Sequence, residues 1–176
     1  MANTYQKGPL RVYVPSNSFL SLYEREYPEG ASQTFPVGSP LKLASGLAVV
    51  WVNPTDASLA AFSLTAGQNT TGATVKVVLA MPEVHFEANL LGSAAADYVL
   101  LATDLGTAYD LKSSSTLLGA ASAGWYVAAT TTDVACRVVQ FDADQPIANS
   151  TSTRPVAGDT NARIKARVEK TKSLWY

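Results

Sequence analysis

The chain has 176 residues, of which 15% are charged, and its formal net charge at pH 7 is −1. This length suits one domain with its own hydrophobic core, and so low a charged fraction argues against a disordered chain or a coiled coil. The near-zero net charge gives no general attraction to nucleic acid or anionic lipid, and the longest apolar stretch, Leu47–Val52, is far too short to span a membrane. We therefore expect neither nucleic acid nor a membrane as a partner.

Residues 1–33 are predicted to form an N-terminal arm. Leu10, Val12 and Val14 alternate with other side chains, which is typical of a strand with one apolar face. Ser18 is a candidate N-cap for a short helix that begins at Phe19 and includes Leu22 and Tyr23. The arm has too little sequence to bury these apolar groups alone. It therefore either adds its strand or helix to a neighbouring protein or completes its own barrel.

Residues 34–176 are predicted to form a single all-β domain, a barrel or a sandwich. Short apolar or alternating runs recur along the segment and are bounded by turn signals such as Ser45-Gly46 and Asn53-Pro54. Strands do not alternate with helices, so a parallel α/β fold is disfavoured, and we expect helix over less than about a tenth of the domain. The runs lie at 41–43, 47–52, 59–64, 75–79, 84–88, 98–102, 125–128, 135–141 and 163–168.

The last 23 residues are basic, with six Lys or Arg against two acids. Arg163, Lys165 and Arg167 alternate with apolar neighbours, which predicts a strand with one solvated face. A docking surface for an acidic partner is the sharper alternative. The chain then ends in Leu174-Trp175-Tyr176, three large side chains that should be buried against the chain itself or a neighbouring subunit.

The residues that could bind metal are few. His85 and Glu87 would share one face of a strand, but the chain contains no second histidine to complete a site, so ordinary solvent-facing positions are the favoured interpretation. Asp104 and the pair Asp142 and Asp144 could suggest calcium, yet a turn with Asx hydrogen bonds is favoured over a calcium loop. We expect no metal and no cofactor.

Catalytic chemistry is also not predicted. The sequence contains no phosphate-binding glycine loop and no nucleophile-elbow motif. Cys136, the one cysteine, cannot form an intramolecular disulfide and is most simply a small buried side chain. No signal peptide is visible at the N-terminus, so we expect synthesis in the cytoplasm. We therefore expect a protein that is not an enzyme.

Several segments, taken in order, resemble the small all-β capsid decoration (cement) proteins of tailed bacteriophages. The resemblance covers about residues 34–170, and it depends on the order of the segments rather than on one diagnostic motif. The segments are TFPVGSPLKLASG at 34–46, TDLGTAYDL at 103–111, GWYV at 124–127, ACRVV at 135–139 and GDTNARIKA at 158–166.

The resemblance implies a compact β-tulip-like or related barrel that binds the outer surface of a phage head as a homotrimer. Such proteins sit at three-fold or quasi-three-fold positions and stabilise the shell against internal DNA pressure, so the implied partners are the major capsid protein and further copies of this chain. On this interpretation, the expected shell or partner contacts are the arm residues Leu10, Val12, Val14, Phe19, Leu22 and Tyr23. The expected subunit contacts are Leu174, Trp175 and Tyr176.

Two other classes of function stay open. A receptor- or carbohydrate-binding β-sandwich of a phage fibre or spike would need exposed aromatic side chains on the barrel. A trimeric β-barrel nucleotide hydrolase would need several carboxylates and a serine-rich phosphate loop in fixed order, and the sequence does not assemble that set.

Overall fold

The computed structural model describes residues 10–13, 20–52, 58–81, 83–114, 124–141, 155–169 and 171–175, and within them it is almost entirely β-structure. The described helical segments are one four-residue α-helix and two short 3-10 turns, which confirms the predicted all-β class. These are α1 (Leu20–Tyr23), η1 (Ser93–Ala95) and η2 (Ala102–Asp104).

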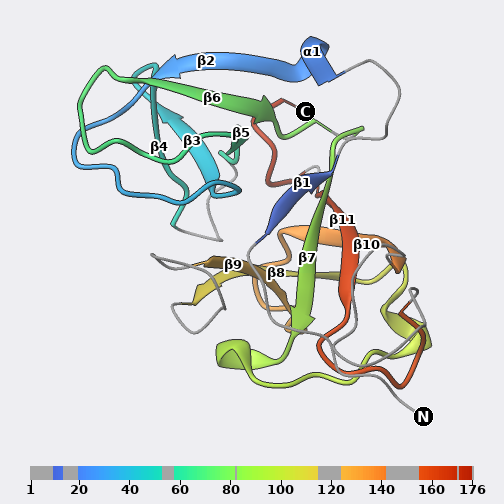
Figure 1. The fold of residues 1–176 in the computed structure, drawn as a ribbon. Helices are drawn as coiled ribbons and strands as arrows, with labels where there is room; N and C mark the ends of the chain where they lie inside the picture. Colours follow the sequence, from blue (N-terminus) through green and yellow to red (C-terminus); the bar gives the residue numbers. More distant parts are fainter. Residues whose placement is uncertain are drawn as a thin grey trace.

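Five strands close into a small barrel, the lower part of the molecule in Figure 1. Going round the barrel, each strand pairs antiparallel with the next, and the last strand returns to the first through the parallel pairs Leu90–Val127 and Leu91–Ala128. Closure leaves these strands without a fully free edge. In this order the strands are β7 (His85–Leu91), β11 (Arg163–Val168), β10 (Cys136–Phe141), β8 (Ala108–Ser114) and β9 (Gly124–Ala128).

A second, five-stranded antiparallel sheet lies above the barrel in the view of Figure 1. Beyond the last paired residue of its first strand, Glu29 forms a parallel bridge with Ala48 of its last strand, so the sheet curls until its two edges meet at one end. Its strands, in spatial order, are β2 (Glu24–Pro28), β6 (Thr74–Leu79), β5 (Ala61–Ser63), β3 (Pro40–Ala44) and β4 (Leu47–Val50).

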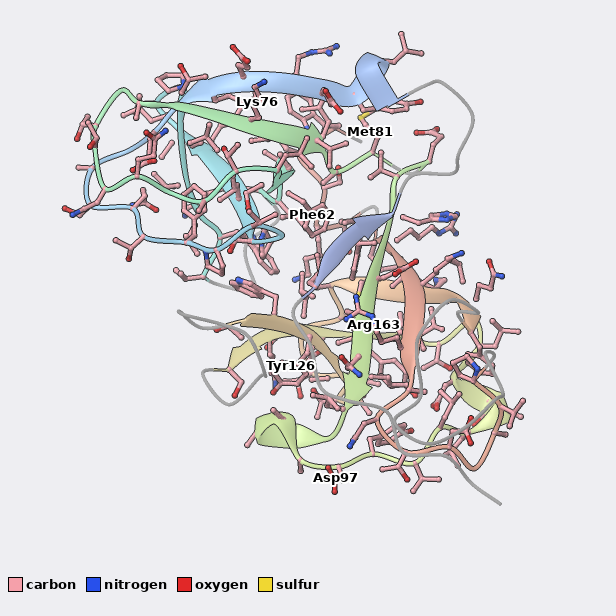
Figure 2. All side chains as sticks on the ribbon, viewed as in Figure 1. Phe62, Lys76, Met81, Asp97, Tyr126 and Arg163 are labelled. Atoms are coloured by element: carbon pink, nitrogen blue, oxygen red, sulfur yellow. The ribbon has the colours of Figure 1, made fainter. Side chains whose placement is uncertain are left out.

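The barrel and the second sheet share one hydrophobic core. Phe62 of β5 packs against Phe86 of β7 with ring centroids 5.0 Å apart, and Trp51 lies 6.4 Å from Trp125 of β9. Figure 2 shows Phe62 at the level where the two sheets meet. Because these large rings fill the space between the two sheets, neither sheet could lose the other without exposing apolar surface.

The arm is built into the same fold. β1 (Arg11–Tyr13) pairs antiparallel with the first half of β7, and β2 pairs along its whole length with β6. The helix predicted from Phe19 is present as α1 but is only one turn long, because the chain enters β2 at Glu24. β1 pairs with a barrel strand, as in the alternative in which the arm completes its own barrel, so the hypothesis that this strand pairs with a neighbouring protein is wrong. β2 was not predicted as a strand, and it joins the second sheet.

The basic strand is a second correction. Arg163, Lys165 and Arg167 do alternate with core residues on β11, as predicted, but Arg163 is only 2% exposed and Lys165 only 6%. Across the strand pair they lie opposite Asn89, Glu87 and His85, and a guanidinium nitrogen of Arg163 donates to the Glu87 carbonyl. Alternation shows which side chains point away from the core but not whether that outer face is solvated, so the expected solvated face is wrong for two of the three residues.

Deleting residues 2–30 tests the place of the arm. The deletion removes β1, β2 and the buried Glu29, and it leaves the paired edges of β6 and β7 open. We expect the truncated chain to lose cooperative thermal unfolding, measured by circular dichroism, because these strands belong to the domain. A truncated chain that melts like the full-length protein would show that the arm is dispensable for folding.

Candidate interaction surface

The expected contact residues of the arm differ in burial: some lie in or against the core and one is exposed. Leu10 is 2% exposed and lies in the shared core, which is a different place from the partner surface expected for it. The backbone of Val12 pairs with Phe86. Tyr23 is half-buried against the core, whereas Leu22 is exposed on α1 and stays a candidate contact. Val14 and Phe19 lie outside the described residues.

The C-terminal segment is attached to its own chain. Ser173 bridges Leu59 in parallel, and the Trp175 indole N–H donates to the carbonyl of Ala60, so the end of the chain runs from the barrel to the second sheet (Figure 1). Leu174 is partly exposed, and Tyr176 lies outside the described residues. A subunit contact at these residues stays a prediction, and of the two that the structure describes Leu174 is more accessible than Trp175.

Four aliphatic side chains are exposed on two adjoining loops of the barrel. We call them the end patch: Val99, Leu101, Leu105 and Val156, each between 49% and 56% exposed. The two loops are adjacent because Val99 bridges Thr160, and because the backbone of Leu100 hydrogen-bonds to Asp159 and Gly158. Figure 2 marks this end of the barrel by Asp97, away from the second sheet.

A buried carboxylate holds the first of these loops. Asp104 is almost fully buried and accepts hydrogen bonds from the backbone N–H of Leu101 at 2.7 Å and from the hydroxyls of Tyr98 and Tyr109. Burial and the neighbouring Asp104 raise the pKa of the Tyr109 hydroxyl, which keeps its proton available for donation. Asp104 thus lies in a turn, as predicted, but its side chain caps η2 by accepting the N–H three residues earlier, so the predicted Asx hydrogen bond is wrong for it. Asp142 and Asp144 lie outside the described residues.

The second loop is held in the same way. The carboxylate of buried Asp159 accepts the backbone N–H of Val156 at 2.9 Å. Asn161, with φ of 56°, accepts the N–H of Tyr98 through its side-chain oxygen and donates to Asp97 through its amide. Both loops of the end patch are thus fixed by buried side chains, so the patch has one preformed shape.

The segments that carry the end patch contain no exposed charged side chain, but charges border them: Asp97 is exposed, and the Arg137 guanidinium, paired with Glu169, donates to the Gly106 carbonyl. Residues 98–106 and 155–158 contain one ionisable carboxylate, Asp104, and it is buried. The rest of the exposed surface of these loops comes from alanine, threonine and glycine. Sequence reasoning treated this region as a strand and a turn and missed the surface; the signal that could have found it is the long uncharged run on both sides of Asp104.

The face that carries His85 and Glu87 does not form a metal site in the described part of the chain. Among the described residues, no cluster of three or more His, Cys, Asp or Glu side chains could hold a metal ion. Glu87 is buried and His85 half-buried, so the expected solvent-facing position is wrong for Glu87. Cys136 is buried as predicted, and burial raises the pKa of its thiol, which keeps it in the unreactive protonated form.

A cleft of about 210 Å³ lies where the second sheet meets the barrel. It is lined mainly by apolar side chains, among them Phe35, Pro36, Val52 and Trp125, with the hydroxyls of neighbouring serines and a threonine. Trp125 and Phe35 are themselves buried. Every aromatic side chain that the structure describes is buried or half-buried, so the described surface offers no open ring for stacking.

Comparison with known proteins identifies no relative: no family model, no curated protein and no solved structure matches the chain. Within the described residues, no helix is both long and apolar enough to cross a membrane.

Replacing Asp104 tests the buried support of the end patch. Asp104→Asn keeps the shape but removes the charge that strengthens the two tyrosine hydrogen bonds and the bond from Leu101, so we expect a loss of about 1–3 kcal/mol in the free energy of unfolding. Denaturant titration followed by fluorescence measures it. The exposed Glu83→Gln is the matched control and should change stability by less than about 0.5 kcal/mol. Equal stability of both variants and the parent would contradict a supporting role.

The pH dependence of stability tests the surroundings of His85. Burial, with the charges of Arg167 and Lys165, lowers the pKa of His85 below its usual 6.5. The unfolded chain then binds the proton more readily, so this contribution to stability is complete above pH 6.5 and is lost as the pH falls toward the depressed pKa. We expect denaturation midpoints between about pH 7 and about pH 5 to fall more steeply for the parent than for His85→Gln. Parallel curves would show that His85 is not coupled to folding.

Proposed function

We propose that the protein is a capsid decoration protein of a tailed bacteriophage. On this proposal it binds the outer surface of the head as a homotrimer at three-fold or quasi-three-fold positions and stabilises the shell against the pressure of packaged DNA. Its partners are the major capsid protein and other copies of itself, and its place is the virion surface. It acts by contact rather than by catalysis.

The end patch is the observation that carries this proposal. A rigid apolar surface on a small β-body suits lasting contact with another protein, since little conformational freedom is lost on binding and the four aliphatic side chains carry no charge that must be desolvated. The segments that resemble decoration proteins build this body: 103–111 runs from η2 into β8, and 158–166 leads from the second loop into β11. The resemblance and the surface therefore support the same function.

The described aromatic residues help to distinguish capsid decoration from the alternative function, receptor or carbohydrate binding. A receptor- or carbohydrate-binding module of a fibre or spike stacks exposed rings on its ligand, whereas the described rings of this chain are buried or half-buried and fill the core. This favours decoration over sugar binding.

Cosedimentation with empty heads tests the proposal. DNA-free shells assembled from a major capsid protein encoded in the same genome should bind the full-length protein to saturation at a fixed ratio, and the decorated shells should survive higher temperature than bare shells. Analytical ultracentrifugation of the free protein should show a trimer. Absence of binding at micromolar protein, with the protein shown to be folded, would overturn the proposal.

A further inference from the structure

We propose that the end patch, rather than the N-terminal arm, is the surface that contacts the shell, and that its occupant is an apolar, uncharged part of the major capsid protein. This inference rests on the proposed function and assigns its contact. It follows from the chemistry of the patch, from its size and from the fact that the arm residues and the edge strand β2 are less suited to contact the shell.

The chemistry of the patch favours a protein occupant. Phosphate-bearing ligands, whether nucleic acid or lipid, are held by exposed Lys or Arg, and residues 98–106 and 155–158 contain neither. The neighbouring Arg137 guanidinium, which reaches the Gly106 carbonyl, is already paired with Glu169. Sugars are held by exposed rings, and the one ring of these segments, Tyr98, is half-buried with its hydroxyl bound to Asp104. What the loops do present is aliphatic surface on a fixed backbone, which matches the apolar centre of a protein interface.

The size of the patch favours a repeated lattice over a second free copy of this chain. Four aliphatic side chains, each about half exposed, present a few hundred Å² of apolar surface, well below the roughly 800 Å² per partner of a standard stable interface. A contact of this size is weak in a free pair. On a shell it is repeated at each position of an oligomer, and linked weak contacts give high overall avidity.

The competing surfaces are less suited to the shell. Leu10 is buried in the core, and β1 is paired with β7, so neither is presented to a partner as the arm hypothesis expected. The strand β2 presents Glu24, Arg25 and Glu26 as exposed side chains, and charges on an edge strand oppose the addition of a further strand. Leu22 is the exposed apolar residue that remains near this edge, which makes it the direct test of the arm.

Matched lysine substitutions test the inference in the same cosedimentation experiment with empty heads. Leu105→Lys and Val156→Lys place a charge in the end patch, and each is expected to weaken binding to the shells by about ten-fold or more. Val37→Lys is the control, with the same change at a position of similar exposure, 54%, and should bind like the parent. Leu22→Lys, at a position 56% exposed, tests the competing contact on the arm, and the inference expects it to bind like the parent as well. Thermal melts confirm that each variant is folded.

The outcomes separate the inference from the proposed function. If the parent binds and the patch variants bind equally well, or if Leu22→Lys alone loses binding, the inference is overturned and the function stands. If the folded parent does not bind, the proposed function fails and the inference with it. Should a lysine variant unfold, hydrogen exchange on the parent decides: amides of 99–106 and 155–158 should gain protection on the shells, and unchanged exchange there would overturn the inference.

Discussion

Strand β7 is the element on which the rest of the fold depends, because both of its edges are hydrogen-bonded to other strands. One edge pairs with β11 from Arg163–Asn89 to Arg167–His85. The other edge is divided, with β1 on its first half and the parallel strand β9 on its second half. Because β9 pairs with the second half of this edge, the barrel closes. Because β1 pairs with the first half, the start of the chain is anchored to the same strand. One face of β7 also contributes Phe86 to the core shared with the second sheet.

Buried carboxylates are the second recurring device. Four of them accept backbone N–H groups of a loop, which satisfies donors that the strand ladders leave unpaired and fixes the loop in one conformation. Glu29 holds the N–H groups of Gln68 and Thr70, and Asp110 holds that of Asp133. Asp104 and Asp159 do the same beneath the end patch. These four buried carboxylates thus serve rigidity, and the two beneath the end patch hold its exposed aliphatic side chains in a defined arrangement.

These two features together connect the fold to the proposed role. A shell-binding protein must keep its contact surface in shape while the particle is under internal load, and a closed barrel with loops fastened to buried groups meets that need. The C-terminal segment adds to it, since the pairing of Ser173 with Leu59 ties the end of the barrel chain to the second sheet. Rigidity of this kind lowers the entropy lost on binding, so a small apolar surface can still contribute affinity.

The sequence by itself determined the class of fold and four of the five barrel strands; β8 (Ala108–Ser114) lies outside the predicted runs, and the predicted run at 98–102 is not a strand in the structure. Alternation in residues 84–88 and 163–168 located β7 and β11, because the period of two is a local property of an extended chain. It also placed Cys136 in the core and Asp104 in a turn, since a small apolar neighbourhood and a short acidic turn are recognisable from adjacent residues.

Only the tertiary structure decided where those strands pair and which faces stay exposed. Pairing of β1 with β7 joins residues more than seventy positions apart, and no local pattern states which edge is open to a distant strand. Burial of Lys165 and exposure of Leu101 both oppose the expectation from residue type, because solvation depends on what the rest of the chain lays over a face. The end patch arises in the same way: two loops far apart in sequence meet through the bridge between Val99 and Thr160, and their side chains form one surface only once that contact is made.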